Sequence, residues 1–158
     1  MTVDPVTYFP GKWTFERKIR DRLAMVDGKA HGTATFTIEG GGLRWLESAR
    51  LEIGEADTRA SRELWIRPDP SVSSGWRVHF DDGRPFHPLE LGDGEPEVTH
   101  PCRDDLYEGS IAIDGENLFR TSWTVRGPRK DQSIETTYRR ISESGSPGLY
   151  LTDSRKEI

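Results

Sequence analysis

The fold is decided by residues 12–20, which read Lys-Trp-Thr-Phe-Glu-Arg-Lys-Ile-Arg. Trp13, Phe15 and Ile19 share one parity, and polar or charged residues occupy the other. A period of two puts alternate side chains on opposite faces of a strand, so this stretch predicts a half-buried β-strand. The same alternation recurs in residues 32–39, 43–53, 58–67, 76–81, 105–113, 117–125 and 130–141.

Turn-forming residues separate these segments. The clearest are Asp27-Gly28, Gly40-Gly41-Gly42, Asp82-Gly83, Asp114-Gly115 and Gly127-Pro128. Asp-Gly pairs favour tight hairpins, so we predict about eight to ten strands joined mostly by short hairpins. Short helical turns fit only residues 5–11, 20–27 or 86–92.

Sequential strands that each carry one apolar face need a shared interior. An up-and-down antiparallel β-barrel supplies it and leaves no exposed edge, so we predict this all-β fold, with a β-sandwich as the alternative. Residues 1–141 are expected to form one barrel domain. Residues 142–158, with Gly145, Pro147 and Gly148, are expected to form a loosely held tail.

Composition narrows the function classes. The chain has 158 residues, of which 33% are hydrophobic and 31% charged, with a net charge of -5. Basic residues are interleaved with acidic ones, which argues against a nucleic-acid partner. No apolar run approaches the ~20 residues of a membrane helix, and no secretory signal is recognisable, so we expect a cytoplasmic protein with no membrane association. The single cysteine, Cys102, excludes an internal disulfide.

At a few positions a charged residue lies on the otherwise apolar face of a predicted strand. Arg17 lies between Phe15 and Ile19, Glu47 follows Trp45 with the same parity, and Arg62 precedes Leu64. A buried unpaired charge costs several kcal/mol, so these groups must pair with each other or meet a polar ligand. Two interpretations stay open: an internal ion-pair network that also includes Asp105, or a ligand pocket with apolar walls.

The candidate site follows from this parity and from residues expected near a barrel mouth. The ligand-binding candidates are Arg17, Trp45, Arg62, Arg84, His87, Cys102, Thr121, Trp123 and Tyr138. If the protein is an enzyme, the catalytic candidates are Glu47, Asp105, Tyr107 and His100. No metal-ligand spacing or phosphate-binding glycine pattern occurs, so neither a metal nor a cofactor is expected.

Two short motifs resemble the lipocalin/calycin group. Gly11-Lys12-Trp13 opens the first strand as the Gly-X-Trp pattern of that group does, and Thr137-Tyr138-Arg139-Arg140 closes the last strand. The resemblance implies that a late arginine packs across Trp13 and plugs one end of the barrel. Arg140 shares the parity of Tyr138, so we prefer it to Arg139 for that role.

Longer blocks resemble a bacterial family of uncharacterised lipocalin-like proteins. That resemblance supplies a fold and no activity. The blocks are residues 9–17, 80–87, 100–107 and 123–131.

Three functions are open. The first is a binding protein for a small anionic or aromatic molecule. The second is a cofactor-independent enzyme of the lyase, decarboxylase, isomerase or cyclase type, by analogy with barrel decarboxylases of phenolic acids. The third is a haem barrel resembling nitrobindin, which the absence of any histidine after His100 disfavours. Trp65, on the outward parity, suggests a homodimer surface.

Overall fold

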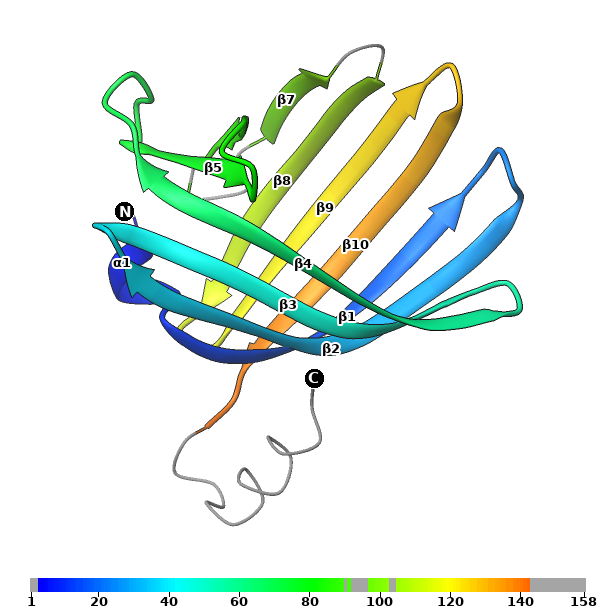
Figure 1. Ribbon diagram of the computed structural model, residues 1–158, viewed down its shortest axis with the longest axis horizontal. Coiled ribbons are helices and arrows are strands. Elements are labelled where there is room, and N and C mark those ends of the chain that lie inside the picture. The colour runs from blue at the N-terminus through cyan, green and yellow to red at the C-terminus, as the bar shows by residue number, and fades with distance from the viewer. Residues whose placement is uncertain (1–2, 90, 92–96, 103–104, 143–158) are drawn as a thin grey trace.

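In the computed structural model, the residues that can be described form one continuous sheet of ten antiparallel strands. Figure 1 shows how this sheet curls. The structure describes residues 3–89, 91, 97–102 and 105–142, and of residues 97–102 the backbone alone. The predicted tail over 142–158 therefore lies almost wholly outside the described residues. The elements are α1 (Pro5–Tyr8), β1 (Gly11–Asp21), β2 (Val26–Glu39), β3 (Gly42–Ile53), β4 (Ala56–Pro68), β5 (Trp76–Phe80), β6 (Pro85–Pro88), β7 (Glu97–Cys102), β8 (Asp105–Gly115), β9 (Leu118–Gly127) and β10 (Lys130–Arg140).

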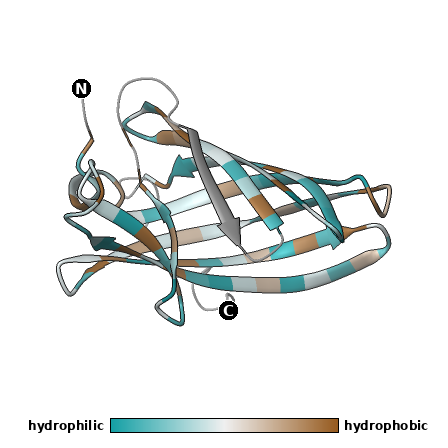
Figure 2. Ribbon diagram, turned by 90° about the horizontal axis from the view of Figure 1, so that it is seen from above, coloured by the Kyte–Doolittle hydropathy of each residue, from teal (hydrophilic) through white to brown (hydrophobic). Residues whose placement is uncertain are grey.

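The strand order is β6-β5-β4-β3-β2-β1-β10-β9-β8-β7. Sequential strands are neighbours except β6 and β7, and β1 pairs with β10, which confirms the up-and-down barrel over the sandwich. Strands β1–β4 curl across the face of β8–β10 (Figure 1), and polar and apolar residues alternate along the strands (Figure 2). Within the described residues, no hydrogen-bonded ladder joins β6 to β7, so the sheet has two edges there.

Three local expectations need correction. The first turn falls at residues 22–25, whereas Asp27-Gly28 lies inside β2. Asp21 causes the earlier turn, because its Oδ1 accepts hydrogen bonds from the backbone N–H groups of Leu23 and Ala24. Residues 85–88 form a strand rather than a helical turn, and residues 97–102 form a strand that the alternation did not reveal. The predicted helical turn near the N-terminus is confirmed as α1.

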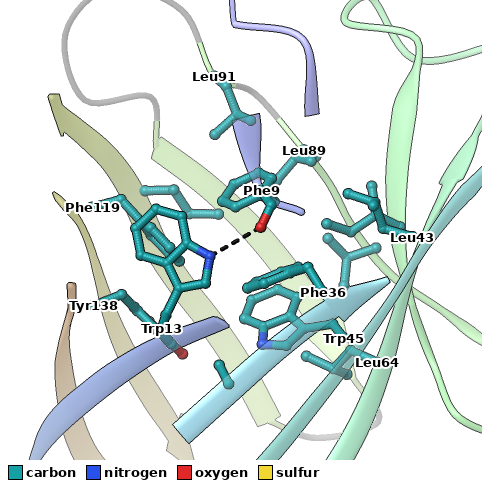
Figure 3. Packing of buried hydrophobic residues seen from close by; sticks show 14 of the residues in the cluster. Phe9, Trp13, Phe36, Leu43, Trp45, Leu64, Leu89, Leu91, Phe119 and Tyr138 are labelled. Atoms are coloured by element: carbon teal, nitrogen blue, oxygen red, sulfur yellow. Dashed lines mark hydrogen bonds between the residues drawn. The ribbon is translucent and has the colours of Figure 1, made fainter. Parts of the chain in front are cut away.

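An aromatic core fills one end of the barrel (Figure 3). Trp13 is fully buried, and its indole N–H donates a hydrogen bond to the carbonyl of Phe9 just after α1. Phe119 packs edge-on against Trp13 at 4.9 Å and stacks on Tyr138 at 4.3 Å between ring centroids. Such ring pairs add to the free energy gained by burying their apolar surface. This half of the barrel is therefore solid.

Arg140 closes the same end. Its guanidinium carbon lies 4.2 Å from the centre of the Trp13 ring, and its nitrogens donate hydrogen bonds to the carbonyl oxygens of Tyr8, Pro10 and Glu116. The structure thus places Arg140, not the exposed Arg139, across the tryptophan. A planar guanidinium can stack on a ring and donate at its edge at once, a combination that lysine lacks.

Candidate functional site

The opposite half of the barrel contains a cavity of about 280 Å³. It is the end toward which β1, β3 and β9 run, near the turns at residues 22–25, 54–55 and 128–129. Most of its wall is apolar. The lining residues are Phe15, Arg17, Ile19, Ala30, Glu47, Ala49, Leu51, Ala60, Ser61, Arg62, Phe86, Tyr107, Thr121, Trp123, Val125, Ile134 and Thr136.

Short side chains create this space. Ala49 on β3 lies directly opposite Gly32 on β2 and Ala60 on β4, so three neighbouring strands carry at most a methyl group there. The close approach of the strands at Gly32 leaves no room for a side chain, because an added Cβ would lie 2.6 Å from the Cα of Ala49. Farther along the same strands, Phe36 and Trp45 fill the interior. The cavity is therefore encoded by a change in side-chain size along each strand.

A polar girdle separates the cavity from the core. We use this name for Thr121, Thr136, Arg17, Glu47 and Arg62, which come from β9, β10, β1, β3 and β4. Thr121 lies opposite Thr136, which lies opposite Arg17, and Glu47 lies opposite Arg62. Neighbouring strands thus bring residues far apart in the sequence to the same depth of the barrel.

Glu47 is the centre of the girdle, with a side chain only 2% exposed. Its Oε1 accepts from Nη2 of Arg17 at 3.0 Å and from Nε of Arg62 at 2.9 Å. Its Oε2 accepts from the indole N–H of Trp45 at 3.0 Å and from the hydroxyl of Tyr138 at 2.5 Å. Four donors satisfy a carboxylate, so this buried charge is fully paired.

The protonation of the girdle follows from these contacts. Burial alone would raise the pKa of Glu47, but the guanidinium groups of Arg62 and Arg17 and the hydrogen bond from Tyr138 outweigh it and lower the pKa to about 2. Burial, reinforced by the charge of Glu47, raises the pKa of Tyr138 well above its usual range. At neutral pH Glu47 is therefore an anion and Tyr138 a neutral donor.

The two arginines differ in their surroundings. Arg17 is 14% exposed, donates from Nε to the Thr136 hydroxyl at 2.8 Å and from Nη2 to the Tyr138 hydroxyl at 3.0 Å, and lies over the Phe15 ring. Arg62 is 45% exposed and is held to Glu47 through Nε. Arg17 is thus locked in place, whereas the outer end of Arg62 is open to the cavity.

Trp123 forms the wall of the cavity across from β4. It lies flat over Gly109, its partner across the strand pair, where an added Cβ would come within 2.5 Å of the indole. Phe86 of β6 stacks on the other side at 5.3 Å, with an interplanar angle of 20°. This contact connects β6 to β9 across the interior. It lies near the gap between β6 and β7, the two strands that the described residues do not join by hydrogen bonds.

Most of the sequence-predicted residues meet at the girdle or the cavity. Arg17, Glu47, Arg62, Tyr107, Thr121 and Trp123 line the cavity. Trp45 and Tyr138 belong to the core, but their polar atoms reach Glu47 from the core side.

Other predicted residues lie elsewhere. Arg84 does not line the cavity: it is exposed on the turn before β6 and donates to Asp82 at 2.7 Å. Asp105 pairs with Lys130 at 3.3 Å instead of joining the network of Glu47. His87 is buried with its Nδ1 2.8 Å from the Pro88 carbonyl oxygen, and its ring packs on Trp123.

His100 and Cys102 lie on β7, where the side chains are outside the described part of the structure. Among the described residues, no three His, Cys, Asp or Glu side chains gather as a metal site. Ala30, Ser61, Phe86 and Thr136 also line the cavity, and the sequence analysis did not single them out. Thr136 has the inward parity of Tyr138, which was a usable signal, whereas Phe86 lies in a strand too short to show alternation.

The chain belongs to a family of unknown function, DUF6314, whose model matches residues 9–140. None of the proteins with curated descriptions matches the chain in sequence. Within the described residues, no helix has the length and apolar character needed to cross a membrane.

Solved structures share the fold at low identity. An S-type phycobiliprotein lyase from Guillardia theta superposes with a TM-score of 0.63 at 11% identity, covering 90% of this chain and 94% of the lyase. A protein of the DUF3598 family from Nostoc punctiforme gives a TM-score of 0.56 at 13% identity, and the match covers 89% of this chain and 50% of that one. A designed fluorescence-activating β-barrel gives 0.44 at 15% identity, with 88% and 99% covered. The likenesses to the lyase and to the DUF3598 protein describe the fold.

Proposed function

We propose that this protein binds a small organic molecule with an apolar body in the open half of its barrel. The observation that carries the proposal is the contrast between the two halves: aromatic side chains pack one end solid, while alanines and a glycine leave about 280 Å³ at the other. Interiors are normally close-packed, and an apolar cavity with a few convergent polar groups is typical of ligand sites.

The protonation states in the girdle favour ligand binding over catalysis of a proton transfer. A general base works best with a pKa near the working pH, and a carboxylate whose pKa is about 2 is a weak base. Tyr138 is likewise a poor proton donor, because its pKa is raised and it already donates to Glu47. Tyr107 keeps a place in the cavity wall where it could orient a ligand.

The proposal also includes a relationship between this barrel and other barrel proteins. We infer a lipocalin/calycin-type relationship from Gly11-Lys12-Trp13 at the start of β1 and from Arg140 lying over Trp13. The phycobiliprotein lyase supports the same barrel, and at 11% identity it supports the fold rather than the ligand.

The experiment uses N-phenyl-1-naphthylamine, a neutral apolar dye that fluoresces when it leaves water. We expect saturable binding to the native protein. Ala49→Phe should fill the cavity and lower the dye affinity by about tenfold or more, the size of losing ~1.4 kcal/mol of binding free energy. Ser48→Phe, one position along β3 on the exposed outer face, is the matched control and should bind as the wild type does.

Circular dichroism and thermal melting establish that both variants are folded. A flat dye titration of the wild type would refute the proposal, and so would equal affinities for the two folded phenylalanine variants.

A further inference from the structure

The cavity contains more positive than negative charge. Among the described residues that line it, the charged ones are Arg17, Arg62 and Glu47. Two guanidinium groups against one carboxylate leave an excess of one positive charge. The Asp105–Lys130 pair balances itself outside this lining. In a cavity with apolar walls the excess is screened far less than at the surface.

The groups still free to bind a ligand are donors. Glu47 already accepts four hydrogen bonds, so its oxygens have little capacity for a ligand's N–H or O–H. Nη1 of Arg17 makes no hydrogen bond within the described residues, and Arg62 is tied to Glu47 through Nε. Thr121 is 7% exposed, and its hydroxyl has no partner in the described part of the chain.

The donors lie at one depth and the apolar surface at another. Thr121, Thr136 and Arg17 follow one another across β9, β10 and β1, and Arg62 approaches from β4. Toward the mouth from this girdle the wall consists of Ile19, Leu51, Val125 and Ile134, together with Trp123. A ligand that matches both parts has a hydrogen-bond-accepting anionic head and an apolar or aromatic tail.

We propose that the ligand is an amphipathic organic monoanion of the carboxylate class, with its head at Arg62 and the threonines of the girdle and its apolar tail toward the mouth. The inference rests on the proposed function and adds the charge, the orientation and the residue that selects for them. A single negative charge neutralises the excess, a second would be uncompensated among apolar groups, and an ammonium group would meet two guanidinium ions.

Four probes of similar body test the charge: 4-phenylbutyrate, 4-phenylbutanol, 4-phenylbutylamine and the dianion phenylsuccinate. Each competes against bound N-phenyl-1-naphthylamine at neutral pH. We expect the butyrate to displace the dye at a concentration lower than the alcohol by about tenfold or more, the order of one charge-assisted hydrogen bond. The dianion and the amine should be weaker than the butyrate.

Arg62→Gln tests the assigned residue. It should lower the ratio of the butyrate affinity to the alcohol affinity from about tenfold or more to about one, both measured on the same variant, and circular dichroism establishes that the variant is folded. Arg59→Gln is the matched control, because Arg59 is exposed on the same strand with the opposite parity, and it should keep the wild-type preference.

The outcomes separate the two proposals. If the dye does not bind, the proposed function fails. If the dye binds and the alcohol or the dianion competes as well as the butyrate, or the butyrate does not compete at all, the monoanion assignment is overturned while the binding function stands. A preference for the butyrate that survives Arg62→Gln would overturn the role of Arg62.

Discussion

Replacing Glu47 with glutamine tests the girdle directly. The lowering of its pKa from 4.5 to about 2 corresponds to roughly 3 kcal/mol of preference for the charged form, at about 1.4 kcal/mol per pKa unit. Glutamine removes that charge and leaves Arg17 and Arg62 facing each other without a counterion. We therefore expect Glu47→Gln to lower the free energy of unfolding by about 3–5 kcal/mol, the range for breaking a buried ion pair.

Urea denaturation at pH 7 measures this loss. Glu52→Gln is the control, because Glu52 lies on the same strand with the opposite parity and pairs loosely with Lys29 at 3.8 Å. That exposed pair should contribute less than about 1 kcal/mol. A loss below about 1 kcal/mol for Glu47→Gln would refute the idea that the girdle is a tightly coupled network.

The ionisation of Glu47 also predicts how the free energy of unfolding changes with pH. The folded pKa of Glu47 lies below the ordinary value, so the stabilisation is complete above about pH 4.5 and is lost as the pH falls through about 2. The stability difference between wild type and Glu47→Gln should be constant near neutrality and shrink over that acid range. A difference that does not change with pH would contradict the assigned pKa.

Three further substitutions probe the frame around the site, each measured by urea denaturation. Arg140→Gln should cost about 2–3 kcal/mol through lost hydrogen bonds to the carbonyl groups of Tyr8, Pro10 and Glu116. Arg139→Gln on the outer face should cost less than about 0.5 kcal/mol, and equal effects would contradict the role of Arg140 in closing the barrel. Gly109→Ala should cost about 1–3 kcal/mol by forcing Trp123 off the strand, and no change would mean that the indole does not lie there. Met25→Gly should stabilise by up to about 1 kcal/mol, because Met25 is exposed with φ at 57°, whereas destabilisation would argue against that backbone conformation.

The long strands were predictable from sequence because a period of two survives in each. Trp13, Phe15 and Arg17 lie on the same face of β1, and this alternation alone predicted that Arg17 faces the interior. The short strands β6 and β7 were not predictable, since Pro85, Pro88 and Pro101 interrupt the pattern and four to six residues show too little alternation.

Parity gives the face of a strand but not the depth along the barrel. Glu47 and Asp105 both have inward parity, yet the strand register places Glu47 opposite Arg62 and leaves Asp105 at the first residue of β8, where Lys130 reaches it. Register depends on the turns, and the turn before β2 was misplaced by a few residues. The ion-pair network and the pocket were weighed as alternatives. In the structure the network forms the floor of the cavity.

A ligand of this protein should enter the half of the barrel bounded by the girdle and Trp123. The most direct measurement is 19F NMR of protein labelled with 5-fluorotryptophan, titrated with 4-phenylbutyrate and assigned with single Trp→Phe variants. The resonance of Trp123 should shift in a saturable manner, while that of Trp65, whose indole N–H donates to Glu63 on the outer face, should stay in place. A shift of Trp65 alone, or an unmoved Trp123 at saturating ligand, would contradict this binding site.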